Sequence, residues 1–134
     1  MRRFWSLALL AFVVMGISTA QVPNLVGNWT GFQNAYAAED GSYKLMENMS
    51  INLNILEQKD RLFKGNIAYT LNGKEIVEGF AGAIGLDNKT LYIAESNKGY
   101  DLGTIISDDE VELIYLQDGA FGWASIEKLH RITR

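Results

Sequence analysis

Apolar and polar side chains alternate with a period of two along much of the chain, the pattern of a strand with one buried face. The clearest stretch has Ser or Asn between apolar residues at Met49, Ile51, Leu53 and Ile55. Some apolar residues here also fit helical spacing, but Asn52 and Asn54 are poor helix formers and the alternation is unbroken. The stretch is therefore predicted as a strand, and the same alternation runs through residues 63–71.

Turn signals divide the rest of the chain into segments of ordinary strand length. The strongest is Asn72-Gly73, because both residues tolerate the positive φ angles of a type I′ hairpin turn. Further turn signals are Asp87-Asn88, Asn97-Lys98-Gly99, Asp108-Asp109 and Asp118-Gly119. The predicted strands cover residues 24–33, 43–56, 61–71, 74–84, 90–95, 100–106, 111–116 and 121–132. Residues 34–42 are polar and Ala-rich, and we expect them to form a loop over one end.

Eight sequential strands with short connections predict an all-β fold, an eight-stranded antiparallel up-and-down (meander) barrel. Such a barrel leaves no exposed sheet edge. A two-sheet sandwich has a similar strand count and is the alternative. Residues 21–134 contain a single proline, Pro23, and no Ser/Gly/Pro-rich linker, so one domain is expected.

The first twenty residues have the pattern of a signal peptide. Arg2 and Arg3 precede an apolar stretch over residues 7–15, and small residues lead to Ala20. The apolar stretch is shorter than the about 20 residues that a membrane-spanning helix needs. We therefore expect cleavage after Ala20, and a secreted, periplasmic or cell-surface protein that is not held in a membrane.

Charge and cysteine content exclude several functions. The chain has no cysteine, so disulfides and thiolate zinc sites are absent. Loss of Arg2 and Arg3 reduces the 12 basic residues to 10 against 16 acidic ones, a net charge of −6. An acidic surface repels phosphate backbones, so nucleic acid is not an expected partner.

Gly27-Asn28-Trp29 opens the first predicted strand. This Gly-x-Trp pattern resembles that of the calycin barrels, which include lipocalins, fatty-acid-binding proteins and avidins. These families commonly carry Gly-x-Trp at the start of their first strand. The resemblance implies that Gly27 allows close approach at a closed end, that Trp29 plugs this end, and that Arg131 packs across Trp29. Trp29-Thr30 and Phe63-x-Gly65 look closest to avidins. Avidins then carry short polar residues that grip biotin, where this chain has Gly31 and Phe32, so biotin binding is not implied.

Aromatic residues on the predicted strands carry the main functional signal. An eight-stranded barrel is wide enough to be filled by side chains or to hold one small ligand. We expect a small, largely apolar ligand in the interior, bound by Trp29, Tyr69, Phe80 and Trp123. A filled core is the opposing interpretation. The alternative function is an extracellular interaction module, such as a barrel-type protease inhibitor that uses an exposed loop such as 34–42.

No catalytic residue, metal ligand or cofactor is expected. His130 is the one histidine, and no Ser or Asp forms a known motif with it. Residues 108–110 (Asp-Asp-Glu) lack the spacing of a calcium loop and are interpreted as a turn. Glu78 and Glu95 share the phase of inward-facing residues, but each is expected at a water-filled barrel mouth. Asn88, in the turn-placed sequon Asn88-Lys89-Thr90, is the best candidate for glycosylation.

Overall fold

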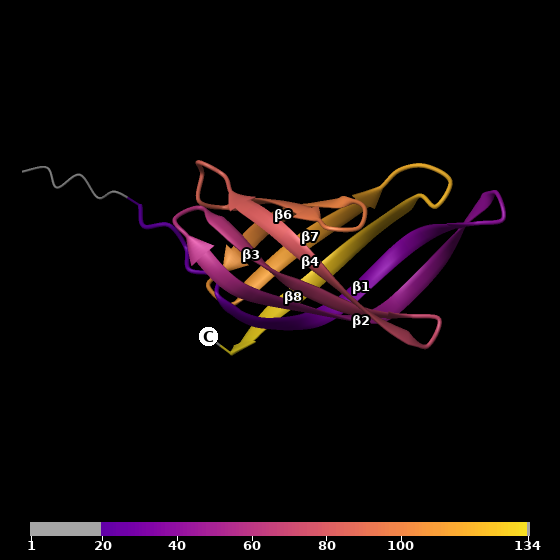
Figure 1. Cartoon of the computed structure of the whole chain (residues 1–134), viewed down its shortest axis with the longest axis horizontal. Helices are drawn as coiled ribbons and strands as arrows, with labels where there is room; N and C mark the ends of the chain where they lie inside the picture. Colours follow the sequence, from indigo (N-terminus) through magenta and orange to yellow (C-terminus); the bar gives the residue numbers. More distant parts are fainter. Residues whose placement is uncertain (1–19, 134) are drawn as a thin grey trace, which may run out of the picture.

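The protein is a closed antiparallel β-barrel with up-and-down connections, described here over residues 20–133 of a computed structural model (Figure 1). Its strands are β1 (Gly27–Glu39), β2 (Ser42–Lys59), β3 (Leu62–Leu71), β4 (Lys74–Ile84), β5 (Thr90–Glu95), β6 (Tyr100–Ser107), β7 (Glu110–Gln117) and β8 (Trp123–Thr133). Each strand pairs with the next, and β1 also pairs with β8. The predicted barrel is therefore confirmed, and the sandwich alternative is excluded.

The predicted loop at residues 34–42 is wrong. Residues 34–39 continue β1, and β2 begins at Ser42 after a turn in which Asp40 and Gly41 have φ angles of 49° and 79°. Ala35 and Ala37 are buried while Tyr36 is exposed, so the period of two persists with small residues on the inner face. Alanine is a weak hydrophobic marker, and the alternation was hidden for that reason.

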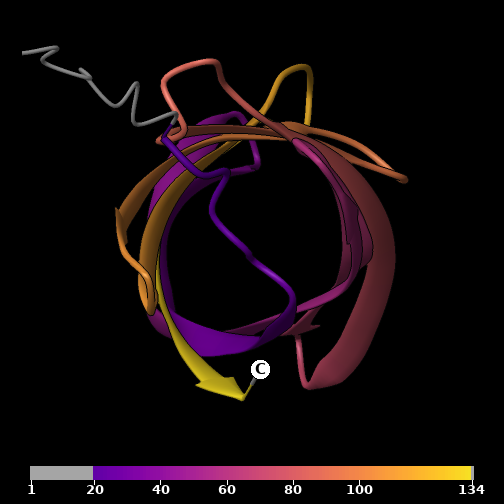
Figure 2. The ribbon, with the colours of Figure 1, turned by 90° about the vertical axis from the view of Figure 1, so that its left-hand side faces the viewer.

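One end of the barrel, which we call the closed end, carries the β2–β3, β4–β5 and β6–β7 turns. Residues 20–26, of which 24–26 were predicted as strand, instead cross this end (Figure 2). Leu25 is 1% exposed and belongs to the core. The Gln58 side chain fixes the crossing, because it accepts a hydrogen bond from the Leu25 N–H at 2.8 Å and donates one to the Pro23 carbonyl at 2.8 Å.

The interior next to the closed end is solid. The rings of Phe63 and Phe80 meet edge to face with centroids 6.1 Å apart. A Cβ added to Gly82 would lie 2.3 Å from the Phe63 ring, and one added to Gly65 would lie 1.9 Å from the Asn54 carbonyl oxygen. These glycines therefore admit aromatic rings and neighbouring backbone, and they do not open a cavity at this level.

Candidate functional site

Trp29 and Arg131 form the closed end together. Trp29 is 1% exposed, and its indole N–H donates to the Leu25 carbonyl at 3.0 Å. The Arg131 guanidinium carbon lies 4.4 Å from the centre of the Trp29 ring, so the contact expected from the Gly-x-Trp pattern is present. Gly27 has a φ of 137°, which side-chain-bearing residues rarely adopt.

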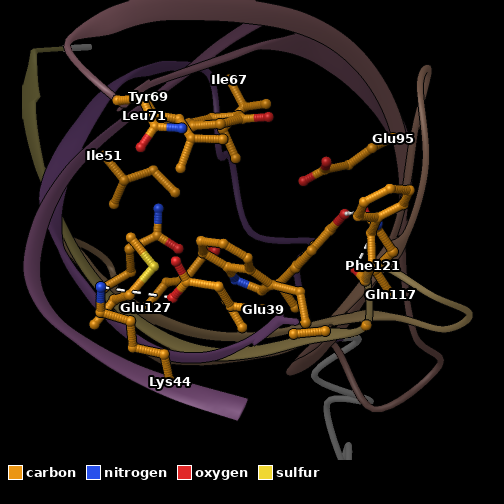
Figure 3. A pocket seen from close by; sticks show the side chains of 18 residues that line it. Glu39, Lys44, Ile51, Ile67, Tyr69, Leu71, Glu95, Gln117, Phe121 and Glu127 are labelled. Atoms are coloured by element: carbon orange, nitrogen blue, oxygen red, sulfur yellow. Dashed lines mark hydrogen bonds and ion pairs between the residues drawn. The ribbon is translucent and has the colours of Figure 1, made fainter. Parts of the chain in front are cut away.

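A cavity of about 500 Å³ occupies the opposite end of the barrel, which we call the open end. This end carries the β1–β2, β3–β4, β5–β6 and β7–β8 turns (Figure 1). The wall includes apolar and aromatic residues from β1, β2, β3, β7, the β7–β8 turn and β8, and carboxyl groups from β5 and β8: Ala37, Ile51, Ile67, Tyr69, Leu71, Glu95, Tyr115, Phe121, Trp123 and Glu127. In Figure 3 the Glu95 carboxyl points into this space, across from Ile51 and Ile67.

Two of the four aromatic residues selected from the sequence lie on this wall. Tyr69 and Trp123 line the cavity, whereas Trp29 and Phe80 do not. Trp29 lies at the closed end, and Phe80 is packed against Phe63 in the solid half. Alternation indicates which face of a strand carries a side chain, as for Tyr69 and Phe80, but it does not indicate the level of that side chain along the barrel axis.

A layer of acidic side chains separates the solid core from the cavity. Asp101 on β6 and Glu127 on β8 are 1% and 2% exposed, and Glu95 on β5 is half-buried. Asp101 is paired in register with Ile93 and Tyr115, and Glu127 with Leu113 and Gln33. All of these neighbours are buried or half-buried, so the register directs both carboxyl groups into the barrel.

Burial changes the protonation of this acid layer. Burial, followed by the charge of Asp101 and then that of Glu78, raises the pKa of Glu95 to about 8. Burial and the charge of Glu127 raise the pKa of Asp101 to about 8, and burial and the charge of Glu95 do the same for Glu127. Desolvation disfavours the charged form and like charges add to it. The three carboxyl groups are therefore largely protonated at neutral pH in the ligand-free barrel.

Hydroxyl and amide groups form hydrogen bonds next to the acid layer, two of them to the neighbouring carboxyl group of Glu78. The Tyr69 hydroxyl donates to Glu78 Oε1 at 3.3 Å, and Asn97 Nδ2 donates to the same oxygen at 3.1 Å. The Tyr115 hydroxyl lies 2.7 Å from Gln117 Oε1. Burial, ahead of the Glu78 charge, raises the pKa of Tyr69 to about 12, so its hydroxyl stays a donor.

The remaining sequence candidates lie away from the cavity. His130 is exposed on β8, and Asp108 lies in the β6–β7 turn, where its carbonyl accepts a hydrogen bond from Arg131 at 2.8 Å. Asn88 lies in the β4–β5 turn with a φ of 54°. Within residues 20–133 no group of three or more His, Cys, Asp or Glu side chains is arranged to hold a metal ion.

Sequence reasoning did not select Asp101 or Glu127. The inward phase of Glu127 was readable, because Glu127 shares it with Trp123 and Leu129 along β8. Asp101 shares its phase with Gly103, whose missing side chain gives no hydrophobic signal.

No helix in the described part of the chain is long and apolar enough to span a membrane. The expected signal peptide falls on residues 1–19, outside the described part, and on Ala20. Comparison of the chain with protein-family models gives no match, and comparison with curated proteins gives none.

Proposed function

We propose that this chain is an exported, calycin-like barrel that binds one small, largely apolar ligand in the open-end cavity. The cavity itself carries this proposal. Its volume of about 500 Å³ is within the range of small-molecule sites, and aliphatic and aromatic side chains make up much of its wall. The solid core beneath it and the covered closed end leave the open end as the route for a ligand.

The neutral, apolar fluorophore N-phenyl-1-naphthylamine tests the proposal. We expect saturable binding with one probe per chain, and quenching of Trp emission because Trp123 lies on the cavity wall. Protein purified from its own source should also be examined by native mass spectrometry for a retained small molecule. Absence of saturable probe binding by correctly folded protein contradicts the proposal.

One observation favours the alternative function, an extracellular interaction module. Exposed apolar side chains form a row across the outside of four neighbouring strands, each paired in register with the next: Tyr92, Leu102, Ile114 and Ile126. They are 41–52% exposed. Contiguous exposed apolar surface is typical of protein–protein contacts. If this row is the functional surface, Ile114→Lys abolishes a protein contact measured by light scattering or cross-linking and leaves probe binding unchanged.

A further inference from the structure

Glu127 presents an unsatisfied carboxyl oxygen at the floor of the cavity. The residue is 2% exposed and lines the cavity. Its Oε1 accepts a hydrogen bond from the Ser125 hydroxyl at 3.2 Å, whereas its Oε2 is buried and has no hydrogen-bond partner. Leaving a buried polar atom unpaired costs free energy, so such an atom calls for a partner that the protein chain does not supply.

Positive charge is missing around this oxygen. No Lys or Arg in the described part of the chain contributes to the pKa of Glu95, Asp101 or Glu127. Lys44 is the basic residue on the cavity wall, and its ammonium group is 3.5 Å from a Glu39 carboxylate oxygen. Both side chains of this pair are more than half exposed, which places the pair at the mouth, away from the buried Glu127.

Aromatic side chains line the same space. Tyr69, Tyr115, Phe121 and Trp123 all contribute to the cavity wall. Aromatic faces attract cations, and most strongly when water is excluded. The cavity therefore combines a desolvated acidic floor with aromatic and aliphatic walls.

We propose that the ligand is a cationic amphiphile, a protonated amine on an apolar body, whose ammonium group binds the carboxylates of Glu95 and Glu127. This inference rests on the proposed ligand-binding function and names the chemical class of the ligand. The ammonium donates to Glu127 Oε2 and to the Glu95 carboxylate, and the apolar body packs against Ile51, Ile67 and the aromatic wall. The charge of Glu78 also acts on Glu95 and adds negative potential beside it.

Binding of such a ligand is coupled to proton release. Glu95 faces Glu78 from β4 and Asp101 from β6, Glu127 faces Glu95 and Asp101, and Tyr69 and Tyr115 border the cluster. The raised pKa values keep Glu95, Asp101 and Glu127 largely protonated at neutral pH, and Glu95 and Glu127 must lose their protons to pair with a cation. Affinity for an amine therefore rises between pH 6 and 8 and falls again once the free amine loses its own proton.

Two nearly isosteric probes separate charge from shape. 1-Naphthylmethylamine is cationic at pH 8, and 1-naphthalenemethanol is neutral. We expect the native protein to bind the amine roughly ten- to hundredfold more tightly, as a charge-assisted contact to a buried carboxylate requires. Calorimetry in buffers of different ionisation enthalpy should show proton release with the amine and none with the alcohol.

Matched variants locate the effect. Glu127→Gln and Glu95→Gln keep side-chain size, and each should remove most of the preference for the amine while binding of N-phenyl-1-naphthylamine persists. Glu110→Gln, at an exposed position on β7, should leave the preference unchanged. If Glu127→Gln does not fold, Glu95→Gln carries the test.

The outcomes distinguish this inference from the proposed function. Binding of the neutral fluorophore without any preference for the amine overturns the cationic-ligand inference alone. Tighter binding of the alcohol at pH 6 than of the amine at pH 8 shows that protonated carboxyls act as donors to a neutral ligand, which also overturns it. Failure of every probe to bind overturns the proposed function and this inference together.

Discussion

The Arg131 guanidinium group lies over the Trp29 indole ring, 4.4 Å from its centre. The same side chain donates to three carbonyl groups: from Nη1 to Val26 at 3.0 Å, and from Nη2 to Asn24 at 2.7 Å and Asp108 at 2.8 Å. Arg131 is thereby joined to the crossing segment and to the β6–β7 turn. Arg131, on the last strand, thus holds both Trp29 and the crossing segment in place at the closed end.

Truncation of Trp29 should destabilise the whole barrel. Trp29→Ala removes a fully buried indole, and we expect a loss of about 3–5 kcal/mol in the free energy of unfolding, measured by urea denaturation. Arg131→Lys keeps the charge but cannot make the same set of hydrogen bonds, and it should cost about 1–3 kcal/mol. Unchanged stability of both variants contradicts the assigned role of the closed end.

Two glycines on β4 should respond differently to the same substitution. A Cβ at Gly82 would lie 2.3 Å from the Phe63 ring, whereas a Cβ at Gly79 would meet ordinary contacts at 3.7 Å or more. Gly82→Ala should therefore cost about 1–3 kcal/mol, and Gly79→Ala should be nearly neutral. Thermal unfolding of the two variants side by side measures the difference, and equal effects contradict a solid core at the level of Gly82.

The acid layer should make stability depend on pH. The carboxyl groups of Glu95, Asp101 and Glu127 have pKa values of about 8 in the folded barrel, well above their values in the unfolded chain. The folded state therefore binds more protons than the unfolded state between about pH 4 and pH 8. The contribution of these groups to the free energy of unfolding is fully present near pH 4 and is lost as the pH rises through 8.

Urea denaturation of the ligand-free protein at pH 5.5 and pH 9 measures this loss. We expect it to be about 2–4 kcal/mol, because the three groups are coupled and do not contribute independently. Glu127→Gln should reduce the difference between the two pH values, and Glu110→Gln should not. Equal or greater stability at pH 9 for the native protein contradicts a buried acid layer.

Sequence patterning was sufficient for the barrel and insufficient for the site. Alternation and turn residues such as Asn72-Gly73 located the strands, since both signals are local. The level of a side chain along the barrel depends on strand stagger, which is a property of the closed sheet. Phe80 and Tyr69 are therefore alike in phase and yet lie in the solid half and on the cavity wall, respectively. Glu127 was overlooked because a buried carboxyl contradicts the hydrophobic pattern that identifies an inner face.

We propose that a ligand occupies the open-end cavity, and enlarging one residue of the cavity wall should exclude it. Ala37 is buried on the inner face of β1 and lines the cavity, whereas Ala124 on β8 is exposed. N-Phenyl-1-naphthylamine should be titrated into the native protein, Ala37→Phe and the matched control Ala124→Phe, with circular dichroism to confirm folding. We expect one saturable site in the native protein and in Ala124→Phe, and at least about tenfold weaker binding in folded Ala37→Phe. Undiminished binding by folded Ala37→Phe, or loss of binding in Ala124→Phe alone, places the ligand outside the cavity and contradicts the claim.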